Sequence, residues 1–149
     1  MTRSVRRDVA ALLQATRQHA FLATVDGDQP SCRVVAPFVD DDLNIWIVTF
    51  RESRKVVQIE QNPRICLSFL EIPGYTREAN VYGQAVIVAA AGEKQRIWTI
   101  AEDNLRRYFP EGPDSENFCL LRVRVDRVEW RQGPISQFQV YRPRHRAAQ

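Results

Sequence analysis

The chain has 149 residues, of which 44% are hydrophobic and 26% charged, and its formal net charge at pH 7 is +3. This length suits one domain with its own core, expected to span residues 1–149, and the composition is that of a soluble globular protein. No apolar run approaches membrane-spanning length and no apolar signal core follows the basic start, so we expect a cytoplasmic protein without a membrane partner.

The three cysteines, Cys32, Cys66 and Cys119, lie in separate apolar, strand-like runs. Their number is odd and no two of them form a CxxC pair, which argues against a zinc site or a disulfide framework. We therefore expect three reduced and buried thiols, in agreement with a reducing cytoplasm.

Hydrophobic periodicity and turn residues divide the chain into helices and strands. In chain order we expect a helix at 4–18, strands at 20–25, 31–39 and 44–49, a helix at 53–61, strands at 65–70 and 80–89, a helix at 92–107 and a strand at 118–130. The pair Asp26-Gly27 indicates a hairpin between the first two strands. Pro37 predicts an edge or a bend in the second strand, and Gly83 predicts a bulge or a close approach in the fifth.

These elements follow the order β-β-β-α-β-β-α-β, which lacks the strict alternation of a doubly wound parallel sheet. We therefore predict a mainly β fold with peripheral helices, in which six antiparallel strands form a closed or nearly closed barrel. The barrel is expected to take up about residues 8–133. Residues 134–149 show little periodicity and are expected to form a tail with a frayed, Arg-rich end.

The most informative segment is Thr49-Phe50-Arg51-Glu52-Ser53-Arg54-Lys55, where the third strand gives way to the second helix. A helix N-terminus presents unpaired N–H groups and a partial positive charge, to which this segment adds hydroxyl donors and basic side chains. A phosphate dianion is the ligand that suits this combination. The alternative is a helix capped by Ser53 with two solvated cations, although acids are favoured over cations at a helix start.

Four pieces of the chain together resemble the pyridoxamine 5′-phosphate oxidase-like superfamily. They are Arg33-Val34-Val35, Thr49-x-x-x-Ser53-Arg54-Lys55, Val81-Tyr82-Gly83-Gln84-Ala85 and Val128-Glu129-Trp130-Arg131-Gln132-Gly133. The resemblance covers roughly residues 8–133, and the segment 98–110 is most similar to the general-stress-protein branch. It implies an FMN-binding split β-barrel, usually a homodimer with two flavin sites at the subunit interface.

The resemblance also implies a cofactor-binding role for the residues that match: Arg33, Val34, Val35, Val48, Thr49, Ser53, Arg54 and Lys55. The three basic residues would hold the FMN phosphate, and the two valines of the second strand would present backbone groups to the flavin ring. Val48 and Thr49 would lie beside the ring and the ribityl chain, and Ser53 would cap the helix or donate to the phosphate. FAD, a deazaflavin coenzyme and haem remain alternatives to FMN.

One departure from the family concerns the substrate. True pyridoxamine 5′-phosphate oxidases carry an Arg-Leu-His-Asp-Arg motif that grips the substrate phosphate, whereas Gly133 is followed here by Pro134-Ile135-Ser136-Gln137-Phe138. Arg131 also stands where those enzymes place a flavin-contacting Trp. Trp130 comes one position early, which on a strand moves the side chain to the other face. We therefore expect a different small-molecule substrate, or none.

Other candidate groups have simpler explanations. His19 ends the first helix and His145 lies in the tail, so both are expected to be structural or solvated. The run Asp40-Asp41-Asp42 lies on one turn, where the three side chains point different ways, and this disfavours a metal site. Tyr82 and Trp98 are expected to pack in the core.

Two functions are compatible with these residues. The first is an FMN-dependent oxidoreductase acting on an unknown small molecule, in which the flavin supplies the redox chemistry and no side-chain nucleophile is needed. The second is a non-catalytic flavin-binding protein of the stress response. A nucleic-acid module, suggested by arginines at positions 122, 124, 127 and 131, is disfavoured because no strand-face aromatics accompany them for base stacking.

Overall fold

The computed structural model describes residues 2–17, 20–74 and 76–144. The elements in chain order are α1 (Thr2–Thr16), β1 (Ala20–Asp26), β2 (Gln29–Val35), β3 (Phe38–Val39), β4 (Ile45–Phe50), α2 (Arg54–Gln61), β5 (Arg64–Leu70), β6 (Glu78–Val88), α3 (Ala91–Leu105), β7 (Phe118–Arg131) and β8 (Gln139–Tyr141). The strands form one antiparallel sheet, which confirms the predicted mainly β fold with peripheral helices. In these ranges no helix is long and apolar enough to cross a membrane.

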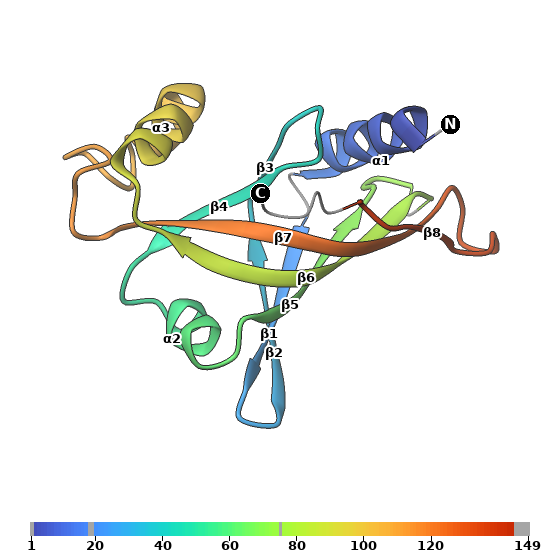
Figure 1. Ribbon diagram of the computed structural model, residues 1–149, viewed down its shortest axis with the longest axis horizontal. Coiled ribbons are helices and arrows are strands. Elements are labelled where there is room, and N and C mark those ends of the chain that lie inside the picture. The colour runs from blue at the N-terminus through green and yellow to red at the C-terminus, as the bar shows by residue number, and fades with distance from the viewer. Residues whose placement is uncertain (1, 18–19, 75, 145–149) are drawn as a thin grey trace.

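The sheet has the strand order β2-β1-β5-β6-β7-β4-β3, with β8 paired to β7, and it curls so that its edges are consecutive in the chain (Figure 1). Only Ala36 and Pro37 separate β2 from β3, and within the described residues no strand pairing joins them. Pro37 cannot donate a ladder hydrogen bond, so it divides the predicted strand 31–39 into these two edge strands. The barrel is therefore open along one side.

The shortness of β3 gives β4 a free edge at the same opening. β3 pairs with β4 only at Ile45 and Trp46, whereas residues 48–50 pair with β7 on their other side. In the described part of the chain, no strand therefore covers this edge of β4. The opening of the barrel thus lies between β2 and the C-terminal half of β4.

Two glycines occupy positions that other residues would strain. Gly27 (φ 63°) takes the first position of the two-residue turn between β1 and β2, which confirms the predicted hairpin. Gly83 lies at a register shift between β6 and β7, and a Cβ there would be 1.9 Å from the carbonyl oxygen of Arg124. The predicted bulge and the predicted close approach both occur at this residue.

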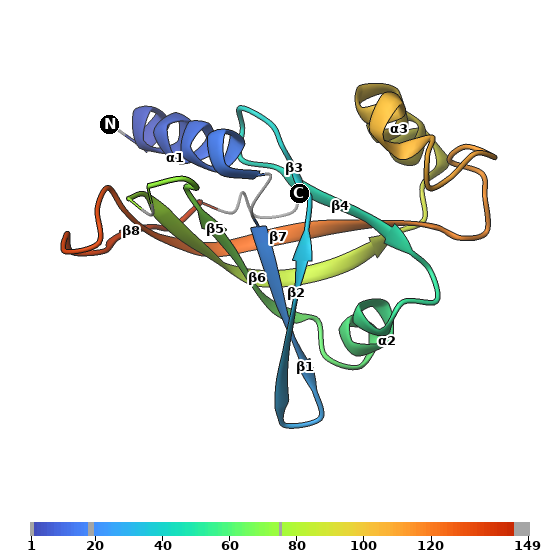
Figure 2. The ribbon, with the colours of Figure 1, turned by 180° about the vertical axis from the view of Figure 1, so that it is seen from behind.

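Two hydrophobic clusters stabilise the fold. The larger one lies on the inner face of the sheet and includes residues of both α1 and α2. In the view of Figure 2, α1 lies above β6 and β7 and α2 lies below them. The smaller one packs α3 against the outer face of β4 and β7 through Trp46, Trp98 and Leu120. Trp98 thus lies in a core, as predicted. Burial of each such large apolar side chain contributes roughly 1.5–3 kcal/mol.

Three expectations need correction. Cys32 is exposed rather than buried, because it lies on the outer face of the edge strand β2, and Cys66 is only half-buried, although all three cysteines are free. Tyr82 is half-buried on the outer face, beneath the guanidinium of Arg127 at 4.0 Å, rather than in a core. Part of the predicted tail joins the sheet, because β8 pairs with the end of β7 that β4 does not reach and buries Tyr141.

Candidate functional site

The N-terminus of α2 holds a hydroxyl without a hydrogen-bond partner. Ser53 precedes the helix in an extended conformation (φ −69°, ψ 151°), and its side chain forms no cap hydrogen bond. Its Oγ is shielded from solvent and has no partner in the described residues. Because buried hydroxyls are normally paired, Ser53 is free to donate to an acceptor at this helix start.

The rest of the first turn of α2 attracts an anion. The first N–H groups of any helix lack intrahelical acceptors and carry a partial positive charge. This turn contains no acid that would compensate the charge. It contains Arg54 and Lys55 instead, so the local potential is positive from both the backbone and the side chains.

Lys55 connects the start of α2 to the end of β4. Its Nζ donates to Oγ1 of Thr49, a buried residue, at 2.8 Å. Burial lowers the pKa of Lys55, and the nearby positive charge of Arg33 lowers it further. The structure therefore brings together the predicted pair Thr49 and Lys55, with the ammonium in a partly desolvated setting.

Arg33 approaches the same place from β2. Its side chain lies on the inner face, where the guanidinium donates to four acceptors: the Leu22 carbonyl (3.0 Å), Thr24 (2.8 Å), Ser31 (2.8 Å) and Gln58 of α2 (3.0 Å). Burial lowers the pKa of Arg33, and the positive charge of Arg54 lowers it too. Arg33 is thus an ordered positive charge. Both of its Nη atoms donate to these acceptors, and its Nε–H has no partner in the described residues.

Arg33, Arg54 and Lys55, called the cation cluster below, have no carboxylate within salt-bridge distance among residues 2–17, 20–74 and 76–144. Arg51 in the same segment behaves differently, since it pairs with Glu60 at 2.8 Å. The hydrogen bond to Glu60 raises the pKa of Arg51. The lack of an acid is therefore a property of the cation cluster and not of the whole segment.

The predicted valines occupy three different environments. Val34 is 65% exposed, and the register from the two-residue turn puts it at a non-hydrogen-bonded position of β2, so its N–H and C=O face the open edge. Val35 is packed in the main core and pairs with Ala20, so its side chain and its backbone are both occupied. Val48 is half-buried at the free edge of β4.

A pocket of about 530 Å³ lies beside this edge. Val48, Thr49 and Phe50 of β4 line it together with Lys55 of α2, and Asn104 and Leu105 at the end of α3 line it together with residues 107–109. The Phe50 and Phe109 rings lie 4.9 Å apart between their centres. The volume is in the range of ligand pockets, and polar groups of the site lie at its rim.

Sequence reasoning missed several residues of this pocket. Arg17, Phe38, Arg107 and Tyr108 all line it, together with Ala36 of the β2–β3 connection. The Arg-Tyr-Phe run at the end of the third predicted helix was a possible signal. Nothing in the sequence placed it against β4, because that contact depends on how α3 packs on the outer face.

The remaining sequence candidates lie elsewhere. His19 and His145 fall outside the described residues. The three side chains of the Asp40–Asp42 run point different ways, as predicted. Asp40 accepts from Asn44 in the same turn, whereas Asp41 accepts from Gln14 and Asp42 pairs with Arg6, both on α1. The described residues contain no group of three or more His, Cys, Asp or Glu side chains that could hold a metal ion.

The end of β7 also differs from a flavin-contacting motif. Trp130 packs against the main core, on the inner face, and its Nε1 has no hydrogen-bond partner in the described residues. Arg131 pairs with Glu78 instead and donates to the carbonyl of Pro134 at 2.8 Å. Trp130 therefore lies on the other face from Arg131, as the offset of one residue predicts.

The family model described as pyridoxamine 5′-phosphate oxidase matches residues 6–131. The chain belongs to this family. General stress protein 26 of Bacillus subtilis (strain 168) is 31% identical to it over 113 residues, which are 72% of this chain and 74% of that protein. This pyridoxamine 5′-phosphate oxidase family member is thus similar to a stress protein, as the segment 98–110 suggested.

Solved structures show the same fold. General stress protein 26 from Bacillus anthracis str. Sterne superposes with a TM-score of 0.76 at 22% identity, over 93% of this chain and 98% of that one. A pyridoxamine 5′-phosphate oxidase-related, FMN-binding protein from Nostoc punctiforme has a TM-score of 0.68 at 21% identity, over 83% and 81%. A haem-binding protein from Mycobacterium smegmatis has a TM-score of 0.72 at 15% identity, over 92% and 57%. This family member therefore has the split-barrel fold.

Proposed function

We propose that this chain binds FMN and that its cation cluster holds the FMN phosphate. The observation that supports this most is the combination of three basic residues without an acid, a buried Ser53 hydroxyl without an acceptor and the free N-terminus of α2. A phosphate dianion would satisfy all of these groups at once. The Nostoc punctiforme neighbour, described as FMN binding, has the same fold.

Each residue of the site would have a distinct part in binding. Arg54 and Lys55 would donate charge-assisted hydrogen bonds, each worth about 1.5–3 kcal/mol. Arg33 is already ordered by its internal hydrogen bonds, so its charge would be provided at little entropic cost. Val48 and the backbone of Val34 would border the rest of the cofactor at the opening of the barrel.

We further propose that the protein is an oxidoreductase acting on a small organic molecule. FMN, when bound, supplies the electron-transfer chemistry of its ring. The aromatic side chains Phe50, Tyr108 and Phe109 would exclude water from the pocket, and Lys55 would keep the negative charge at its rim. A cytoplasmic location stays a prediction.

A homodimer with the cofactor at the subunit interface completes the proposal. Phe21 and Val34 are partners across β1 and β2, and both are exposed apolar side chains on the outer face beside the open edge. Such an apolar face suits a second copy of the chain. Sedimentation of the flavin-loaded protein should show dimers, and monomers with bound flavin would overturn this part.

The alternative of a flavin-binding protein without turnover is separated by one experiment. Reduced nicotinamide, added under anaerobic conditions, should bleach the flavin of an oxidoreductase rapidly. Flavin that stays oxidised with both NADH and NADPH would favour the non-catalytic, stress-related function.

Haem is the second candidate cofactor, because one structural neighbour is described as haem-binding. Haem iron needs a His, Cys, Met or Tyr ligand, and Tyr108 is the one such side chain among the described residues that line the pocket. The absorbance spectrum of the purified protein tests both cofactors. A flavin doublet supports the proposal, whereas an intense Soret band would overturn it, and mass spectrometry of the extract distinguishes FMN from FAD or a deazaflavin coenzyme.

A further inference from the structure

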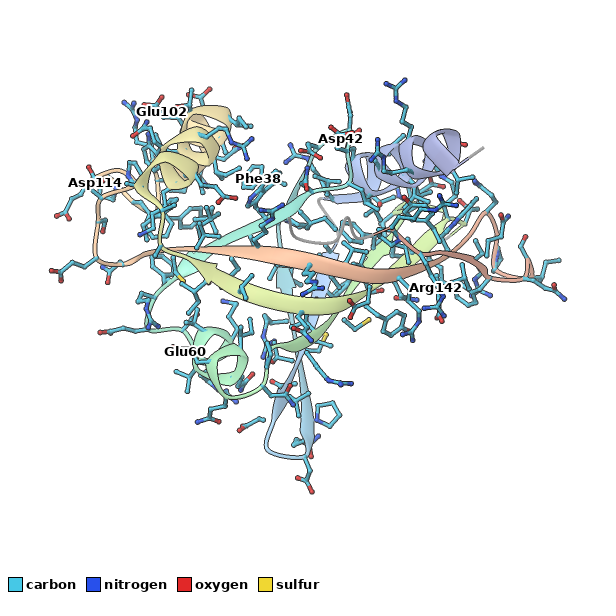
Figure 3. The ribbon with its side chains drawn as sticks, viewed as in Figure 1. Phe38, Asp42, Glu60, Glu102, Asp114 and Arg142 are labelled. Carbon is cyan, nitrogen blue, oxygen red and sulfur yellow. The ribbon has the colours of Figure 1, made fainter. Side chains whose placement is uncertain are left out.

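The pocket of about 530 Å³ beside β4 is called the flavin pocket below. A second hollow, of about 370 Å³, lies next to it, between the end of α1, the β3–β4 edge and α3. The two hollows share three lining residues: Arg17, Phe38 and Asn104. Figure 3 shows Phe38 in the space between α3 and α1. A molecule in this second hollow would therefore touch the boundary of the flavin pocket.

Two guanidinium groups stack on aromatic rings in this hollow. The Arg17 guanidinium carbon lies 5.6 Å from the centre of the Phe38 ring, and that of Arg96 lies 4.8 Å from the centre of the Trp46 ring. In the described residues, neither arginine forms an ion pair or a side-chain hydrogen bond. A guanidinium held over a ring by a cation–π contact still has its N–H groups available to an acceptor.

The acids near these arginines are engaged elsewhere. Asp40 is the one acid among the described lining residues, and its carboxylate accepts from the backbone N–H groups of Asp42 and Asn44 and from the Asn44 side chain. Glu93 accepts the Trp46 Nε1–H at 2.8 Å. Among the described residues neither carboxylate forms an ion pair with Arg17 or Arg96, so the N–H groups of both guanidiniums stay available to an anionic acceptor.

The rest of the lining is apolar. Trp46 and Ile97 are buried, and Ile100 on the next turn of α3 is 64% exposed although it borders the hollow. Asn104 adds a polar group at the boundary with the flavin pocket. A flat apolar body that covers Ile100 and carries one negative group matches this lining.

We propose that this second hollow binds aromatic carboxylates, with the carboxylate on Arg96 and Arg17 and the ring against Phe38 and Ile100. This binding site is argued from its own residues and does not depend on FMN. The further assignment, that an aromatic carboxylate is the class of substrate presented to the flavin, rests on the proposed function.

The test compares 2-naphthoate with 2-naphthylmethanol, a neutral compound of similar shape, by isothermal titration of flavin-free and FMN-loaded protein. We expect 2-naphthoate to bind at least about tenfold more tightly than the neutral compound, since one charge-assisted hydrogen bond accounts for that factor. Arg96→Gln and Arg17→Gln should each remove most of this difference. Arg106→Gln is the matched control, because Arg106 lies at the end of the same helix, pairs with Glu102 and does not line the hollow.

Equal binding of the two compounds, or equal loss in Arg106→Gln and Arg96→Gln, would overturn the site. FMN titration of the same variants separates the two proposals, because Arg96 is outside the cation cluster and its loss should leave FMN binding unchanged. Naphthoate binding that is lost in Arg96→Gln upholds the site whatever the FMN result. A wild-type protein that does not bind FMN overturns the proposed function, and with it the assignment of the carboxylate as substrate.

Discussion

Arg33 on β2 and Lys55 on α2 lie close enough for the charge of the arginine to lower the pKa of the lysine. Both side chains are partly buried, and no acid in the described part of the chain pairs with either. Two like charges held together in this way oppose folding unless an anion compensates them. A phosphate site requires two such neighbouring positive charges. Their proximity therefore favours an anion site over a simple helix start at residues 49–55.

Lys55→Ala should weaken FMN retention strongly while the fold stays intact. The side chain has one hydrogen bond, to Thr49, so its removal costs little structure but takes away a charge worth about 1.5–3 kcal/mol to a bound dianion. Combination with Arg33→Ala should remove any residual binding, at some cost in stability because Arg33 holds four acceptors. Flavin content per polypeptide and circular dichroism measure the two effects.

Arg51→Ala provides the control for this prediction. Arg51 belongs to the same segment, but it is paired with Glu60 and lies outside the cation cluster. Its loss should leave the flavin content unchanged. Normal flavin content in the Lys55 and Arg33 double variant would show that the phosphate is held elsewhere.

Local features of the backbone were predicted better from the sequence than contacts between distant segments. The strand-to-helix segment 49–55, the break at Pro37 and the approach at Gly83 depend on local backbone chemistry, which single residues reveal. The contact between Arg33 and Gln58 joins two distant segments, and the part of the pocket formed by the end of α3 and residues 107–109 depends on the packing of α3. Such contacts follow from tertiary arrangement, and no local pattern encodes them.

The affinity for FMN should depend on pH on both sides of neutrality. Towards acid, binding should weaken below about pH 6, where a phosphate monoester takes up its second proton. Towards alkali, binding should weaken at a lower pH than the 10.5 of a free lysine, because the pKa of Lys55 in the flavin-free protein is lowered. Lys55→Arg should lose the alkaline decline and keep the acid one. An alkaline decline that persists in this variant would contradict the role of Lys55.

Removal of the Lys55 charge should stabilise the flavin-free protein. The pKa of Lys55 is lower in the folded chain than in the unfolded one, so the unfolded chain binds more protons and stability rises with pH through that window. At neutral pH the cost of the charge is present in full, and Lys55→Met should remove it and raise the Tm, by about 2–4 °C for each kcal/mol. Inorganic phosphate should raise the Tm of the wild type but not of the variant. A lower Tm in Lys55→Met without phosphate would contradict the electrostatic account.

Gly83→Ala should destabilise the protein strongly. A methyl group there would overlap the Arg124 carbonyl oxygen, and this backbone atom cannot move without disrupting the pairing of β6 with β7. The expected cost is about 1–3 kcal/mol or more in the free energy of unfolding. Gly92→Ala in α3 is the control, since a Cβ there meets nothing within 4 Å and should be neutral or slightly stabilising. Denaturant titration of both variants gives the comparison, and similar midpoints would contradict it.

In the proposed site the phosphate, rather than the ring, fixes the flavin to this protein. The most direct test is the ratio of the dissociation constants of riboflavin and FMN, which differ only in the phosphate. We expect FMN to bind about a hundredfold or more tightly than riboflavin, as at least two charge-assisted hydrogen bonds imply, and we expect Lys55→Met to reduce this ratio sharply. Equal affinity of the wild type for both flavins would show that the cation cluster does not hold the FMN phosphate.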